Sequence, residues 1–295
     1  MVWVTWRQHR IEAFVSLIVI LLAALFLWKT GMDMRSGFQQ QGVEGIQNQS
    51  TLFSAIEMLC SVVFPLLLGV FVGAPLVSQE IEQGTHRFIW TQSVTRRYWF
   101  WIKASCLICA TGIATIVLGG LLLWWEAPIE TALGIWQTYD VQVVVLFGYT
   151  LFSLVLGICL GTMIQKTVPA MGLTLILFLV LRLGIENILG PYFLPVLVTD
   201  DKFPGTYSSL SKNWVLSQQL VDQQGHLANM PQVCSIVTQA QDSIGTCLQK
   251  YGIHNIVVYH PVNQFWAFQG IEVAIFLGLA LILLLITYRS IQRLS

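Results

Sequence analysis

Charged residues are scarce in this chain of 295 residues, where they make up 10% of the sequence while hydrophobic residues make up 55%. Soluble globular proteins carry about 25% charged residues, so this composition argues against a water-soluble protein. The 15 basic and 15 acidic residues balance one another. Without a basic surplus, nothing indicates nucleic acid as a partner. We therefore expect a protein whose main partner is the lipid bilayer.

Several motifs that carry chemistry are also missing. A phosphate-binding Walker A loop needs Gly-Lys followed by Ser or Thr, and no lysine here follows a glycine. The chain contains neither His-Glu-x-x-His nor Gly-x-Ser-x-Gly. Cys106 and Cys109 stand within an apolar run, where packing explains them better than redox chemistry. We expect a protein that is not an enzyme and that itself binds no metal and no cofactor.

The chain does contain long apolar runs. A helix needs roughly 17–25 apolar residues to cross the hydrocarbon core of a bilayer. Backbone groups cannot stay unpaired in lipid, so such runs are expected to be helical. The chain is therefore predicted to be an all-α integral membrane protein, with one transmembrane domain over residues 1–295. Its six transmembrane helices are expected at 11–28, 54–77, 101–124, 141–164, 168–189 and 267–288.

The distribution of basic residues predicts the topology of these spans. Cytosolic segments of membrane proteins are enriched in Lys and Arg, which favours an N-in/C-in arrangement here. The basic residues then expected in the cytosol are Arg7, Arg10, Arg87, Arg96, Arg97, Lys103, Lys166, Arg289 and Arg293. In this arrangement 79–100 is a cytosolic loop, 30–50 is a Gln-rich external segment, and 190–266 is a large external loop. Residues 1–10 form either an interfacial helix or an ordinary basic flank.

The cytosolic loop carries a sequence motif. Residues 73–87 read GAPLVSQEIEQGTHR, and residues 91–96 read TQSVTR before Lys103. This pattern resembles the type-2 ATP-binding-cassette (ABC) permease family, in which acidic residues end the second span and Gly-Thr, a short helix, a turn and a lysine follow. The opening WVTWRQHR (3–10) and the closing FWAFQGIE (265–272) also resemble bacterial six-span members of that family.

The resemblance implies that a short coupling helix between spans two and three docks on an ATPase subunit. The residues concerned are Glu80, Glu82, Gly84, Thr85, His86, Arg87, Thr91 and Arg96. The chemistry of the residues agrees, because Gly84 can end one helix and Thr85 can cap the next. The alternative is a solvated loop whose aromatic residues Phe88 and Trp90 rest on lipid headgroups.

The resemblance also implies a function. It identifies the chain as the permease subunit of an ATP-driven exporter in the bacterial cytoplasmic (plasma) membrane. Two copies, or this chain and a related permease, are expected to form the pathway. ATP and Mg²⁺ are expected on a separate ATP-binding-cassette ATPase subunit. The alternatives are a secondary transporter or channel that needs no ATPase and, third, a membrane-embedded enzyme that acts on lipids.

Two further groups of residues are candidate sites. Cys234 and Cys247 lie together in the external loop, where disulfides persist, and we expect a bond between them. A zinc site with His254 and His260 fits no common ligand spacing. Charges within spans are costly and usually face a partner or a wet cavity. The candidates for substrate contact or for an internal structural pair are Glu57, Arg182, Glu186 and Glu272.

Overall fold

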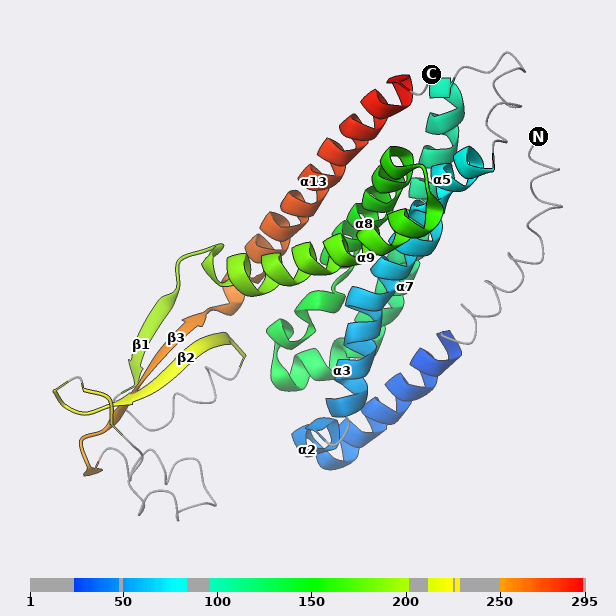
Figure 1. Ribbon diagram of the computed structural model, residues 1–295. Coiled ribbons are helices and arrows are strands. Elements are labelled where there is room, and N and C mark those ends of the chain that lie inside the picture. The colour runs from blue at the N-terminus through cyan, green and yellow to red at the C-terminus, as the bar shows by residue number, and fades with distance from the viewer. Residues whose placement is uncertain are drawn as a thin grey trace.

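The computed structural model describes residues 24–47, 50–83, 96–201, 212–224, 226–228 and 250–293. They form a bundle of long helices with a small sheet projecting from one end (Figure 1). The elements of the bundle are a helix over 24–41, α2 (Val43–Gln47), α3 (Ser50–Met58), η1 (Leu59–Val63), α4 (Phe64–Leu67), η2 (Leu68–Gly73), α5 (Pro75–Glu82), α7 (Arg96–Leu133), η3 (Ile135–Val141), α8 (Val143–Ile164), α9 (Thr167–Gly184), η4 (Ile185–Leu189), η5 (Gly190–Tyr192), η6 (Val262–Gln264) and α13 (Phe265–Arg293).

Five helices in the described part of the chain are long and apolar enough to cross a membrane. They cover Thr51–Glu82, Phe100–Leu133, Ile135–Ile164, Thr167–Tyr192 and Val262–Gln292. The structure is therefore mainly helical and multi-spanning, and these helices correspond to five of the six predicted spans. The first predicted span, 11–28, lies mostly outside the described residues, as does the whole segment 1–10.

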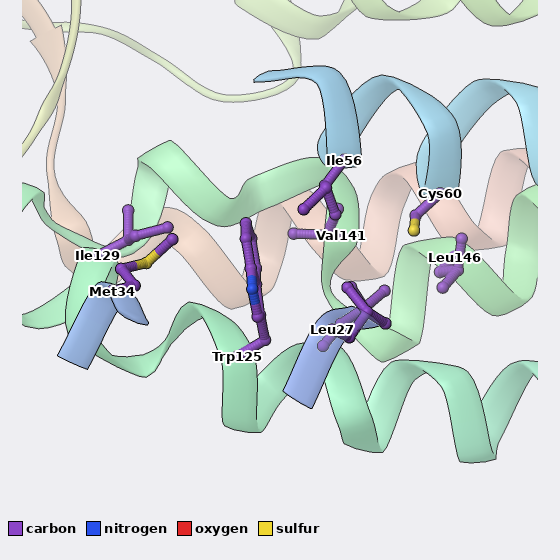
Figure 2. Close-up of a cluster of buried hydrophobic side chains, with 9 residues drawn as sticks. Leu27, Met34, Ile56, Cys60, Trp125, Ile129, Val141 and Leu146 are labelled. Carbon is purple, nitrogen blue, oxygen red and sulfur yellow. The ribbon is translucent and has the colours of Figure 1, made fainter. Parts of the chain in front are cut away.

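The segment 30–50, predicted to be external, is helical over most of its length. The helix that includes residue 24 continues to residue 41, and α2 follows it after Gly42. Leu27 and Met34 project from one face of this helix into a cluster with Trp125, Ile56 and others (Figure 2). Polar residues occupy the opposite face, so this helix contains no continuous apolar run by which it could be predicted.

Two hydrogen bonds and a stacked pair reinforce this contact. The indole Nε1 of Trp125 donates to the hydroxyl of Thr30 at 3.0 Å. Arg35 lies 3.8 Å from the centre of the Trp124 ring and donates to its backbone carbonyl oxygen at 2.5 Å. Trp28 stacks on the same Trp124 ring with centroids 4.9 Å apart. A charged residue is thus accommodated within the helix, because its guanidinium has both a cation–π and a hydrogen-bond partner.

The helix from α3 to α5 contains two wide turns that precede prolines. η1 and η2 are π-helical segments, and Pro65 and Pro75 follow them closely. A proline ring removes one backbone donor and clashes with the turn before it, so a locally wider turn relieves the contact. In the second turn the amide of Ala74 instead donates to the carbonyl of Gly69 at 2.9 Å.

α8 lies at the centre of the bundle and is the most buried of the spanning helices. Its Gly157 and Gly161 face Gly69, Gly73 and Ala74 on η2 and the start of α5. A β-carbon at Gly157 would overlap the carbonyl oxygen of Gly69 and lie 2.8 Å from the amide nitrogen of Ala74. Small residues spaced by four allow such close backbone approach between helices in membranes.

We expect Gly157→Ala to destabilise the protein by about 1–3 kcal/mol, because the added methyl group cannot enter the packed interface without moving a backbone. Gly172→Ala on α9 is the matched control, since nothing lies within 4 Å of the position of its β-carbon. Thermal unfolding of the purified chain in detergent measures both. Equal unfolding temperatures for the two variants would contradict the packing.

The segment 190–266, predicted to be external, contains a three-stranded antiparallel sheet, so the fold is not helical throughout. β1 (Leu197–Asp201) and β2 (Trp214–Val221) flank β3 (His254–His260), with a bulge between Val215 and Ser217. The buried His260 connects the sheet to the bundle through two contacts. One of its ring nitrogens lies 3.1 Å from the carbonyl of Pro191, and its ring packs on Phe268 at a centroid distance of 4.6 Å.

The bundle thus has two distinct ends. At the sheet end lie η3, the end of α9, the sheet and the beginning of α13 (Figure 1). At the opposite end, here termed the loop end, α5 finishes, α7 begins, α8 turns into α9 and α13 finishes. The tight turn there places Gln165 in the left-handed region, with a φ of 59°. The described parts of the segments predicted to be cytosolic therefore share one end.

Candidate functional site: a buried polar cluster and its cavity

A buried arginine organises the sheet end of the bundle. Arg182 lies near the end of α9, and its side chain is fully buried. Its Nη2 donates to Oδ1 of Asp140 at 2.6 Å, and its Nη1 donates to Oε2 of Glu186 at 2.9 Å. The guanidinium also lies 4.0 Å from the centre of the Tyr149 ring. A buried guanidinium needs such paired contacts, because taking it out of water costs several kcal/mol.

Glu272 joins this arginine to two further elements. Its carboxylate accepts hydrogen bonds from the hydroxyls of Tyr139, at 2.7 Å, and Tyr149, at 2.8 Å. One of its oxygens lies 3.6 Å from Nη1 of Arg182. Elements η3, α8, α9 and α13 therefore meet at one group of side chains. We call it the polar cluster, and its members are Arg182, Asp140, Glu186, Glu272, Tyr139 and Tyr149.

The polar cluster contains more acidic than basic groups. Three carboxylates surround the single guanidinium, and their side chains are 20%, 39% and 3% exposed for Asp140, Glu186 and Glu272. Glu57 on α3 adds a fourth acidic group that interacts electrostatically with Asp140, Glu186 and Arg182. The arrangement therefore gathers four acidic groups around a single basic group.

A cavity of about 170 Å³ adjoins the polar cluster at the sheet end. Its walls are formed by three of the carboxylates and by aromatic side chains from η3, β2, α13 and the segment after η5. The lining residues are Trp136, Tyr139, Asp140, Glu186, Gly190, Phe193, Trp214, Phe268 and Glu272. Trp136 is central to the aromatic part, with ring centroids 5.3 Å from both Trp214 and Phe268.

A second buried contact connects η3 to α7 beside this site. The side chain of Gln142 donates to Oε1 of Glu126 at 2.8 Å and lies 3.3 Å from the hydroxyl of Thr138. Glu126 is fully buried. It escaped the sequence analysis because the span predicted at 101–124 ends before it, whereas α7 continues to Leu133.

A model of the family described as "ABC-2 membrane transporter related" matches residues 16–189, more than half of the chain. The chain belongs to this family. No curated protein and no solved structure gives a significant match. The resemblance to type-2 ABC permeases is thereby confirmed. The match covers Asp140, Arg182 and Glu186, but it ends before the sheet and before Glu272.

The charged residues predicted within the spans of this ABC-2 chain lie near one another in the structure. The structure brings Arg182, Glu186 and Glu272 together and places Glu57 within electrostatic range of the first two. It adds Asp140, Tyr139 and Tyr149, which the sequence analysis missed. Asp140 stands immediately before the apolar run at 141–164, so a search for charges within spans passed over it. A tyrosine within such a run carries no comparable signal.

The two acidic residues predicted to couple this ABC-2 chain to an ATPase make contacts within the chain at the loop end. Glu80 forms a salt bridge with Lys103 at the start of α7. Oε2 of Glu82 accepts hydrogen bonds from the backbone amide of Thr167 at 3.0 Å and from its hydroxyl at 2.8 Å. Thr167 is the first residue of α9, so Glu82 satisfies amide groups that a helix N-terminus leaves unpaired.

The other predicted sites lie beyond what the structure describes. Gly84, Thr85, His86, Arg87 and Thr91 are outside the described residues, and of Arg96 only the backbone, which begins α7, is described. Cys234 and Cys247 are also outside them. The described cysteines Cys60, Cys106, Cys109 and Cys159 are free. In the described ranges, no group of three or more His, Cys, Asp or Glu residues is placed to hold a metal ion.

Replacing Arg182 with Met should destabilise this ABC-2 protein by about 3–5 kcal/mol, because three carboxylates would lose the cation that neutralises them in the interior. Arg289→Met is the matched control, since Arg289 is exposed on α13. The free energy of unfolding in detergent distinguishes the two. A loss at Arg182 no larger than that at Arg289 would show that the polar cluster contributes little to stability.

Proposed function

We propose that the chain is the permease subunit of an ATP-driven exporter, with the polar cluster and its cavity on the substrate pathway. Membership of the ABC-2 membrane transporter related family carries this proposal. The family points to a transporter component and not to a catalytic enzyme. The five spanning helices agree with a multi-pass membrane protein. Two permease chains form the pathway, and a separate ATPase subunit binds ATP and Mg²⁺.

The contacts at the loop end support a mechanical role for the loop 79–100. The salt bridge of Glu80 with Lys103 joins the end of α5 to the start of α7. The hydrogen bonds of Glu82 to Thr167 join the same end of α5 to the start of α9. A force that an ATPase applies to the loop therefore acts on three spanning helices together, and not on a detached connector.

α9 provides a physical connection between the loop and the cavity. It begins at Thr167, beside Glu82, and carries Arg182 in its last turn before Glu186 in η4. At 1.5 Å per residue, the 18 residues of α9 span roughly 27 Å, close to the thickness of the hydrocarbon core. In the proposed cycle, closure of the ATPase displaces the start of α9, and the polar cluster at its other end rearranges.

The topology follows from the proposal, with the loop end in the cytosol and the sheet outside. In the full chain a sixth span at 11–28 places the N-terminus inside, with residues 1–10 in the membrane interface. A disulfide between Cys234 and Cys247 then forms in an oxidising compartment.

A reporter enzyme active only in the cytosol should work when fused after Arg293, and it should fail when inserted in the turn at Gln223–Gln224. Asp222 shapes this turn, because its carboxylate accepts from the amides of His226 and Gln224, and these bonds hold its pKa below the usual value. Activity of the reporter at this turn would reject the topology. Matched expression of both fusions is the control.

Glu82→Lys should leave the chain folded and inserted but uncouple it from its ATPase. Reversing the charge removes the acceptor for Thr167 and opposes the charge complementarity expected at the docking surface. In liposomes that contain chain and ATPase, hydrolysis should fall to the rate of the ATPase alone. Glu44→Lys, at an exposed residue of α2, should have no such effect.

The same reconstitution distinguishes the alternatives. Transport by the purified chain without an ATPase, unaffected by Glu82→Lys, would establish a channel or secondary transporter and overturn the proposal. Co-purification from cells at native expression should recover an ATPase subunit with the chain. Recovery of the chain without an ATPase, together with transport that needs no ATP, would contradict the ATP-driven mechanism.

A further inference from the structure

From the geometry at the sheet end we infer that the cavity binds an organic cation, in the form of an amine or quaternary ammonium headgroup. The inference rests on the proposed function only in naming this ligand as the exported substrate or as part of it. The binding itself is a property of this chain alone. It depends on four features of the cavity: its charge, its aromatic walls, an unpaired donor and its size.

The ionisable groups of the cavity wall are acidic. Asp140, Glu186 and Glu272 all line the cavity, whereas the fully buried Arg182 does not. The guanidinium is thus in contact with the carboxylates but does not itself line the cavity. A ligand in the cavity meets three acidic groups before it meets the single compensating cation. An anionic ligand would face these carboxylates directly, which is unfavourable at short range.

Aromatic rings form the rest of the wall. Trp136 lies 5.3 Å from Trp214 and 5.9 Å from Tyr139 between ring centroids, and Phe268 and Phe193 continue the surface. Aromatic faces attract cations through their quadrupole, and cages of this kind recognise quaternary ammonium groups. These rings would contribute less to the binding of an inorganic cation. The described residues also contain no group of acidic side chains that converges as metal ligands do.

A polar atom of Trp136, a residue that lines the cavity, has no hydrogen-bond partner in the described part of the chain. The indole Nε1 of Trp136 is buried and makes no hydrogen bond within the described part of the chain. Leaving a buried donor unpaired is unfavourable, so a ligand whose acceptor reaches Nε1 would be favoured. A hydroxyl or carbonyl oxygen close to the cationic group, as in an amino alcohol, meets this requirement.

The size of the cavity limits what enters it. At about 170 Å³ it is smaller than the roughly 300–1,000 Å³ of pockets that enclose drug-sized ligands. It therefore holds a headgroup and not an entire large amphiphile. A bulkier substrate would leave its apolar part outside the cavity, against the lipid-facing surface of the bundle. The ligand class is thus an organic cation with an oxygen acceptor near its charge.

Choline and its uncharged isostere 3,3-dimethylbutan-1-ol test this inference, because they share shape and hydroxyl and differ in charge. Binding to the purified full-length chain in detergent is measured by titration calorimetry, without an ATPase. Choline should bind at least about tenfold more tightly than the isostere, as expected for a desolvated cation–π site with adjacent carboxylates. Equal binding of the two would overturn the inference, and so would preferential binding of methyl phosphate.

Two variants locate the site. Glu186→Gln removes one charge, at the most exposed of the three carboxylates, and keeps an oxygen that can accept from Arg182. Trp136→Leu removes an aromatic wall and its donor. Each should weaken choline binding about fivefold or more. Glu44→Gln and Trp101→Leu change exposed residues outside the cavity and should leave binding unaltered.

Unfolding temperatures confirm that each variant is folded before binding is compared. Choline affinity unchanged in both folded cavity variants would place binding elsewhere and overturn the inference. The outcome is independent of the coupling experiment. If the chain stimulates its ATPase but does not bind choline, only the cation site is rejected. If it binds choline in the cavity but transports without an ATPase, the site stands and the ATP-driven function is rejected.

Discussion

The burial of the Arg182 guanidinium is the constraint on which the sheet end of this protein depends. An unpaired guanidinium in the interior would cost several kcal/mol, a large part of the net stability of a typical domain. Its partners come from three elements: Glu186 from the adjoining η4 and, distant in sequence, Asp140 from η3 and Glu272 from α13. Each of these elements must therefore place its acidic residue within reach of the guanidinium. The position of the sheet depends on the same region, because His260 on β3 contacts the carbonyl of Pro191.

The rest of the bundle depends on packing and not on charge. α8 is surrounded by other helices, and its glycines bring its backbone against η2 without intervening side chains. Such contact supplies dispersion energy where lipid offers no hydrophobic drive to associate. The outer helices keep large apolar side chains on their surface, such as Ile113 and Ile116 on α7. In a soluble protein these would be a liability, whereas in a bilayer they face lipid.

Five of the spans follow from apolar runs alone, because a bilayer demands length and hydrophobicity whatever the details of packing. The limits of the helices do not follow. Residues 29–41 contain Lys29, Asp33 and Arg35, yet they continue a helix whose other face contacts Trp125. Part of the polar cluster could be predicted from the sequence, since Arg182 and Glu186 are charged residues within a span. Asp140 and the two tyrosines become recognisable only when α8, α9 and η3 are placed in space, and the cavity depends on Trp214 from a loop with no sequence signal.

The two ends of α9 differ in how firmly they are held, and this difference bears on mechanism. At the loop end, its first residue is held by Glu82 through two hydrogen bonds near the surface. At the sheet end, Arg182 is held by several charged partners in the interior, which are costly to separate. In the proposed cycle, a displacement of the loop would therefore move the start of α9 more easily than its end at the polar cluster. A cation in the adjoining cavity would weaken the attraction of the carboxylates for Arg182. Occupancy of the cavity would thus loosen the firmly held end, which gives a physical route by which substrate influences the loop.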